Sequence, residues 1–224
     1  MSQVPFPRPD TFLADDWTFL VFLLCLILVA WSRNSDPGNI SRLWHNAFNI
    51  RLMRQDMREE TQHRRSKLAH FINFCLILGL LVYYTGSEKI AQHYPHLHGV
   101  LLYSILVLGI AVLYQFKGLV IQYITHLASN DFTLSEYRYS LFLLNRIAGL
   151  ILIPSALLAS YSDPDHARWY VLSGFGLFGI VLLYRWFRGV QNAFRSNIPS
   201  FYIFFYICTL EFLPLAAAAK AISL

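Results

Sequence analysis

Charged residues are scarce in this sequence. Asp, Glu, Lys and Arg together make up 14% of its 224 residues, whereas hydrophobic residues make up 56%. A water-soluble domain of this size is poorly compatible with that balance, because much of its surface would be apolar. The apolar residues also form long blocks, such as 19–31 and 101–113, that are apolar on every helical face. The composition therefore argues against an ordinary soluble domain and predicts helices surrounded by lipid.

Cysteine is nearly absent, and the common catalytic motifs are missing. Cys25, Cys75 and Cys208 all lie inside apolar blocks without C-x-x-C spacing, which is typical of small buried hydrophobes and not of disulfides or zinc ligands. The chain contains no nucleophile elbow, P-loop or H-E-x-x-H sequence. These absences make an enzyme less expected without excluding one, and we expect no cofactor.

A leader peptide and a nucleic-acid-binding domain are not expected either. Three acidic residues, Asp10, Asp15 and Asp16, precede the first apolar block, and no A-x-A-like cleavage site follows it. The first block is therefore predicted to remain as a membrane helix. The net charge of +5 comes from cations that flank the apolar blocks, so they are predicted to set topology and not to bind nucleic acid.

The sequence predicts an all-α membrane protein, with residues 1–224 forming one bundle of about six transmembrane helices. The predicted spans are 16–32, 68–85, 99–117, 137–160, 169–186 and 201–222. The first is the weakest, because its apolar run of about 15 residues is short for a bilayer core that requires ~20, so five spans remain an alternative. Thr133 and Glu136 have capping-box spacing before the fourth span, and Asp163 followed by Pro164 predicts the start of the fifth.

The distribution of Lys and Arg predicts the orientation. Residues 33–67 contain eight of them, and Arg185, Arg188 and Arg195 lie at the end of the fifth span. The positive-inside rule places both stretches in the cytoplasm. With six spans, both termini are then predicted to lie in the periplasm.

The stretch 33–67 is also the one sizeable predicted extramembrane segment, and it is basic and amphipathic. Its apolar residues Leu43, Trp44, Ala47, Phe48 and Leu52 recur at helical spacing. Its first half either lies on the inner membrane surface as a docking or lipid-sensing helix, or is a solvated connector with a basic face. Both interpretations remain open.

Several stretches resemble one family of multipass membrane proteins. They are 185–195, 206–215 with the later Lys220, the pair Asp16 and Trp17, and 48–51. On these residues the chain resembles a Bacteroidota family labelled only as a domain of unknown function, and the resemblance covers most of the chain. It implies a bacterial inner-membrane protein and brings no activity, substrate or cofactor.

Ionisable residues inside a span are the best functional candidates, since they cost ~2.5–3.5 kcal/mol on insertion scales. Lys117 and Lys220 are predicted near helix ends, where long side chains reach the headgroups. Arg146 and Glu211 are predicted deeper, about 14–15 Å from the cytoplasmic ends of their helices, and therefore to pair, with Asn145 nearby. The pair is either a static contact between the fourth and sixth spans, which we favour, or a proton site at Glu211.

Histidines offer only a weak metal candidate. His93, His96 and His98 form one cluster between the second and third spans, but no Cys or second cluster completes a zinc or copper site, so a solvated loop is preferred and no metal is expected. Haem is not expected, because His70 and His126 are predicted near helix ends.

A phosphate-handling site is a further alternative. Asp131 would act as acid or base beside Arg185, Arg188 and Arg195, which would hold the phosphate of a lipid-linked substrate. The competing interpretation of these arginines is the positive-inside rule, which we prefer.

The leading functional hypothesis is a non-enzymatic inner-membrane protein, an accessory or scaffold component of a cell-envelope assembly. A small transporter or proton-coupled subunit using the Glu211 and Arg146 pair is the alternative, and a membrane enzyme on lipid-linked phosphates is third. The predicted partners are the lipid bilayer and other membrane proteins or further copies of the chain. The small residues Ser173, Gly174, Gly176 and Gly179 would provide a close-packing helix face.

Overall fold

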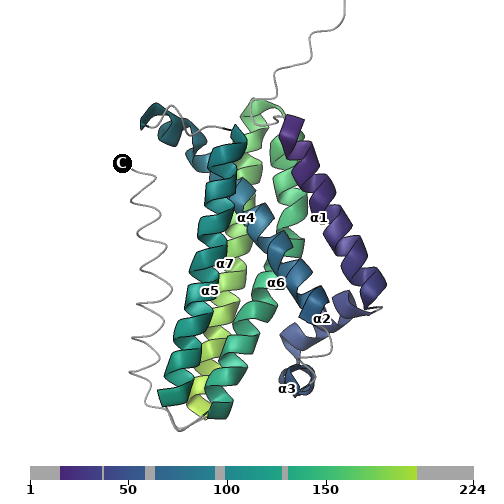
Figure 1. Cartoon of the computed structure of the whole chain (residues 1–224), viewed down its shortest axis with the longest axis vertical. Helices are drawn as coiled ribbons and strands as arrows, with labels where there is room; N and C mark the ends of the chain where they lie inside the picture. Colours follow the sequence, from purple (N-terminus) through teal and green to yellow (C-terminus); the bar gives the residue numbers. More distant parts are fainter. Residues whose placement is uncertain (1–15, 37, 59–63, 94–98, 128–130, 196–224) are drawn as a thin grey trace, which may run out of the picture.

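The computed structural model describes residues 16–36, 38–58, 64–93, 99–127 and 131–195, and all regular structure within them is helical (Figure 1). The helices are α1 (Asp16–Ser35), α2 (Asn39–Phe48), α3 (Ile50–Arg58), α4 (Arg64–His93), α5 (Gly99–Leu127), α6 (Asp131–Tyr161) and α7 (Pro164–Arg195). Among these, α1, α4, α5, α6 and α7 are long and apolar enough to cross a membrane.

The predicted all-helical fold is therefore confirmed in the described part of the chain. The first predicted span, the weakest in the sequence, is an apolar stretch of 19 residues, Trp17–Ser35. Helix α6 has 31 residues, which at 1.5 Å per residue gives about 46 Å, well beyond the ~30 Å of a hydrocarbon core. A helix of this length that crosses a bilayer would therefore extend past the hydrocarbon. The sixth predicted span, 201–222, lies outside the described residues, and the total of six stays a prediction.

The two predicted helix starts have different outcomes. Helix α7 begins at Pro164, and the carbonyl oxygen of Asp163 accepts the backbone N–H groups of His166 and Ala167, so that boundary is confirmed. The capping box predicted from Thr133 and Glu136 is wrong. Helix α6 begins at Asp131, two residues before Thr133, and the Glu136 carboxylate binds Arg54 of α3.

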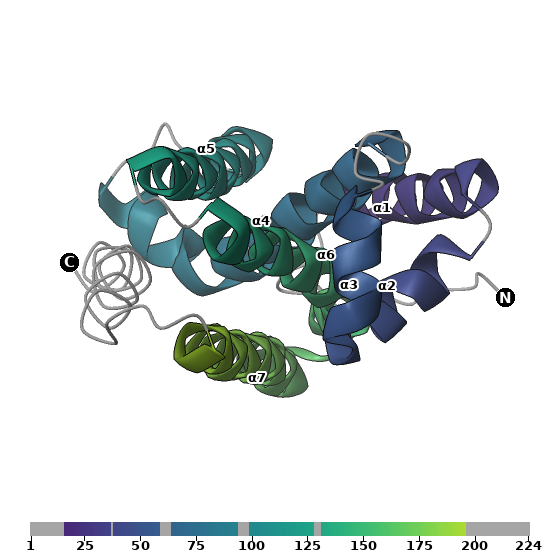
Figure 2. The same ribbon diagram turned by 90° about the horizontal axis from the view of Figure 1, so that it is seen from below.

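Helix α6 is the centre of the bundle. It packs most extensively against α7 and α4, while α5 covers α4 and α6, and α1 lies along α4 (Figure 2). Successive long helices alternate in direction. As a result, α1, α5 and α7 finish at the same end of the bundle at which α4 and α6 begin. We call this the basic end, because Arg33, Lys67, Arg138, Arg185 and Arg188 lie toward it.

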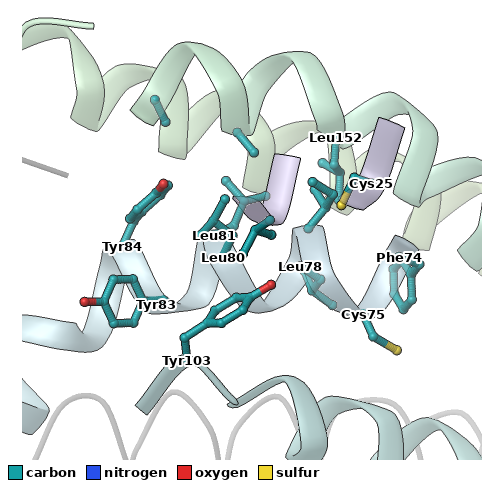
Figure 3. Packing of buried hydrophobic residues seen from close by; sticks show 14 of the residues in the cluster. Cys25, Phe74, Cys75, Leu78, Leu80, Leu81, Tyr83, Tyr84, Tyr103 and Leu152 are labelled. Atoms are coloured by element: carbon teal, nitrogen blue, oxygen red, sulfur yellow. The ribbon is translucent and has the colours of Figure 1, made fainter. Parts of the chain in front are cut away.

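The apolar core surrounds α4, which lies between α1, α5 and α6. Leu80 and Leu81 of α4 are fully buried there together with Cys25 of α1 and Leu152 of α6 (Figure 3). The approach of α4 to α6 is close at Gly149, where an added Cβ would lie 2.8 Å from the Cα of Phe74. Glycine is therefore required at this crossing for steric reasons.

The amphipathic segment folds against the bundle as two short helices. In α2, Leu43 and Ala47 are buried in a small core with Met53 of α3 and Tyr139 of α6. Other members of the predicted apolar stripe, including Phe48, stay exposed. The solvated-connector interpretation is therefore wrong for the described residues, because one face of the segment is an integral part of the fold.

Candidate functional site: an arginine clamp and a buried polar layer

Arg188 of α7 holds the end of α2. Its guanidinium donates hydrogen bonds to the carbonyl oxygens of Ala47 at 2.6 Å and Asn46 at 3.3 Å, and it lies 3.0 Å from the sulfur of Met53. Tyr184, one turn earlier on α7, donates to the same Ala47 carbonyl at 2.8 Å. The last carbonyls of a helix lack partners within it and carry partial negative charge, so a buried cation is well matched to them. We call these contacts the arginine clamp.

Helix α3 is held by charged and polar contacts with α6 and α4. The guanidinium of Arg54 lies 2.5 Å from the carboxylate of Glu136, a residue that is 2% exposed. The hydroxyl of Tyr139 donates to the carboxylate of Asp56, and Lys67 lies 3.7 Å from that carboxylate and over the Tyr139 ring. Both carboxylates thus lie opposite cations, which offsets the cost of removing them from water.

A second group of polar residues lies inside the bundle, between its basic end and the apolar core. Ser66, His70 and Asn73 follow each other at intervals of four and three residues on α4, so they share one helix face. Ser32 of α1 is hydrogen-bonded to the Ser66 hydroxyl and, at 2.9 Å, to Nε2 of His70. All four side chains are buried, and neither amide atom of Asn73 has a hydrogen-bond partner among the described residues.

Helices α6 and α7 complete this group, which we call the polar layer. Arg146 of α6 is 8% exposed, and it precedes the crossing of Gly149 with Phe74 by about one turn, as His70 does on α4. Its neighbour Asn145 accepts a hydrogen bond of 3.3 Å from Arg185 of α7. Asn145 was predicted to support a pair of Arg146 with Glu211, whereas its observed partner is Arg185. The polar layer thus consists of Ser32, Ser66, His70, Asn73, Asn145, Arg146 and Arg185.

Two side chains that were predicted near helix ends are buried instead. Helix α5 continues ten residues beyond Lys117 to Leu127, and Lys117 is only 9% exposed. Its neighbour Gly118 packs against the Phe142 ring of α6, so Lys117 lies within about one helical turn of the level of Asn145. The placement of Lys117 at a helix end is therefore wrong, whereas contact of its side chain with the headgroups stays a prediction. His70 is likewise 1% exposed and lies inside α4, not at its end.

Two of the three arginines of the predicted phosphate site have described side chains, and these two bind different partners. Arg185 and Arg188 are each 3% exposed and bind Asn145 and the end of α2, so they do not form an open anion site with each other. Asp131 and Arg195 are the first residue of α6 and the last of α7, and their side chains lie outside the described part.

Other predicted candidates fall wholly or partly outside the described residues. Glu211, Lys220, His96 and His98 are among them, and His93 is described only as the last residue of α4. Contact between Arg146 and Glu211 therefore stays a prediction. Within the described ranges, no three His, Cys, Asp or Glu side chains gather as a metal site.

Most of the polar layer is not predicted by the sequence. Its members in α1 and α4 each lie in or beside an apolar block, where a single polar residue does not by itself indicate a site: Ser32, Ser66, His70 and Asn73. The available signal was the spacing of Ser66, His70 and Asn73, which places three polar side chains on one face of a predicted span.

Five apolar helices, outward-facing hydrophobic side chains and a partly polar interior together fit a polytopic helical membrane protein. The chain belongs to the family described as a domain of unknown function (DUF4271), which matches residues 18–222. No curated protein and no solved structure matches the chain.

Proposed function

We propose that this protein is a non-enzymatic integral component of the bacterial inner membrane, an accessory or scaffold subunit of a cell-envelope assembly. The observation that carries the proposal is the use of charge at the basic end. Arg188 binds the backbone of α2, and Arg54 binds Glu136, so charges that an enzyme would present to a substrate stabilise the chain's own fold.

The proposed orientation follows from the same charges. Arg33, Arg54, Arg65 and Arg188 belong to the basic end, whereas Arg168 is near the start of α7 at the opposite end. The positive-inside rule then supports a cytoplasmic basic end and a periplasmic N-terminus. If 201–222 forms a sixth span, the C-terminus is periplasmic too.

A partner surface is supported by the outer side of α7. The predicted small-residue face of this helix is divided: an added Cβ at Gly174 would lie 3.0 Å from Oγ of Ser155, whereas Gly176 and Gly179 have nothing within 4 Å. Gly174 thus serves contacts within the bundle. Gly176 and Gly179 leave room for a helix of another membrane protein or a second copy of this chain.

The test is affinity purification of the full-length protein from its native membrane in mild detergent. A partner or second copy should be present in stoichiometric amount, and Gly176→Leu should reduce its recovery severalfold. Gly109→Leu is the matched control, because Gly109 of α5 also has nothing within 4 Å. Recovery of the wild-type protein as a monomer without a partner would contradict the proposal, as would equal losses with both variants.

The polar layer favours one alternative, a proton-coupled membrane subunit. Chains of hydrogen-bonded polar side chains inside a membrane span are typical of proton relays, and His70 is connected to Ser32 and Ser66 by hydrogen bonds within the bundle. In proteoliposomes carrying a pH-sensitive dye, proton movement that His70→Gln and Glu211→Gln each abolish would support this alternative. Absence of proton movement across an imposed potential would remove it.

A further inference from the structure

The α2 and α3 segment has two unlike faces. Its inner face, with Leu43, Ala47 and Met53, is buried against α6 and α7. Its outer face carries three large hydrophobic side chains that stay exposed: Trp44 is 39%, Leu52 40% and Phe48 71% exposed, and the centroid of the Phe48 ring lies 6.0 Å from that of the Tyr184 ring. These three residues form what we call the apolar edge of the segment.

The position of the segment brings this edge to the membrane surface. Helix α2 begins at Asn39, four residues after the apolar stretch of α1 ends at Ser35. Figures 1 and 2 show α2 and α3 at the basic end, on one flank of the bundle, beside the first part of α6 and just beyond the end of α1. A flank at the level where spanning helices leave the hydrocarbon faces lipid headgroups and the adjoining acyl chains.

The arginines of the α2 and α3 segment differ in whether they form ion pairs within the described chain. Arg42 is paired with Asp36, and Arg54 with Glu136. Arg51 of α3, three residues after Phe48 and next to Leu52, is exposed and has no ion-pair partner for its guanidinium among the described residues. Arg33 at the end of α1 and Arg65 at the start of α4 are also exposed. The apolar edge is thus accompanied by cations that the fold does not use.

We propose that the α2 and α3 segment is a binding site for anionic phospholipid. Trp44 and Phe48 lie at the boundary between headgroups and acyl chains, and the guanidinium of Arg51 binds the lipid phosphate. An aromatic edge next to an unpaired cation matches this ligand, since aromatic rings favour the interface and basic residues favour anionic headgroups. The arginine clamp fixes the segment in place, so the site is preformed on a rigid support. The proposal is independent of the proposed function.

The experiment uses the full-length protein in detergent and native mass spectrometry. Phosphatidylglycerol or phosphatidylcholine is added, and retained lipid is counted as the detergent is removed. The wild type should retain phosphatidylglycerol in preference to phosphatidylcholine. Arg51→Gln should reduce that retention about fivefold, which corresponds to about 1 kcal/mol for one surface cation. Arg168→Gln, at an exposed arginine of the opposite end, should leave it unchanged.

A second measurement tests the apolar edge in nanodiscs. Lipids brominated near the headgroup should quench a component of the tryptophan fluorescence that Trp44→Phe removes. Equal retention of the two lipids, equal effects of Arg51→Gln and Arg168→Gln, or a Trp44 component that brominated lipid does not quench would each overturn the proposal. Loss of a co-purifying protein in Arg51→Gln, without a change in lipid retention, would also overturn it and identify a protein-binding surface.

Discussion

Arg188 of α7 donates a hydrogen bond of 2.6 Å to the carbonyl oxygen of Ala47, joining residues 141 positions apart in the sequence. The contact ties the last long helix of the described chain to the short helix that follows the first. An arginine that the positive-inside rule explains by topology alone therefore also has a structural role. The positive charge of Arg188 thus bears on both the predicted topology and the packing of α2 against α7.

The crossing of α4 and α6 gives a first prediction. Gly149→Ala should lower the free energy of unfolding by about 1–3 kcal/mol, because the new Cβ would meet the backbone of Phe74 and the helices must separate. Gly109→Ala, where nothing lies within 4 Å, should change it by less than about 0.5 kcal/mol. Thermal unfolding in detergent measures both. Equal destabilisation by the two variants would contradict the close crossing.

The docking of α3 gives a second prediction. Asp56→Ala removes the acceptor for the Tyr139 hydroxyl and the carboxylate opposite Lys67, which is 8% exposed. The loss of this hydrogen bond and of the carboxylate beside Lys67 should cost about 1–3 kcal/mol. Trypsin should then cleave at Arg51 and Arg54 faster than in the wild type. Gln55→Ala, at an exposed neighbour, is the control, and faster cleavage in that variant as well would show that the contacts of Asp56 are not responsible.

The predicted contact of Arg146 with Glu211 is tested by a double-mutant cycle. Either Arg146→Met or Glu211→Gln alone should lower the free energy of unfolding by roughly 3–5 kcal/mol if the pair is fully buried, since each leaves one charge without its counterpart. The double variant should recover part of that loss. Additive effects would show that the residues do not interact. Recovered stability without recovered cellular function would indicate that Glu211 works as a proton site.

The proposed orientation is tested by reporter fusions. Alkaline phosphatase, which is active only outside the cytoplasm, should be active when fused after Leu224 and inactive when fused after Gln62. The reason is the excess of Lys and Arg at the basic end. Activity at both positions would point to a different arrangement of the first spans. An inactive fusion at Leu224, with residue 62 still inside, would instead favour five spans.

The sequence predicts the helices better than it predicts what their polar residues do. Long apolar blocks identify the spans, and Asp163 followed by Pro164 locates the start of α7, because these signals are local. The partner of Glu136 was missed, because Arg54 is 82 positions away and a local capping pattern competed with it. The apolar stripe of α2 was identified, but periodicity alone does not show that Leu43 faces protein while Phe48 stays exposed.

The candidate site was harder to predict for the same reason. Burial of Lys117 depends on where α5 ends, and composition gives that boundary poorly. The polar layer forms only when Ser32 of α1 meets His70 of α4, which requires the packing of two helices whose polar residues are sparse. Arg188 was selected as a candidate because of its charge. Its acceptors, however, are backbone carbonyls, which every residue has, so the sequence does not indicate which of them it binds.

The central claim is that the charges of the basic end hold the protein's own fold together, and the free energy of unfolding of Arg188→Met tests it most directly. Methionine keeps much of the volume but removes hydrogen bonds to two buried carbonyls, so the wild-type value should fall by about 2–3 kcal/mol. Arg168→Met, at an exposed position of the same helix, should stay within about 0.5 kcal/mol of the wild type. If Arg188→Met is as stable as Arg168→Met, the clamp does not support the fold and the account is contradicted.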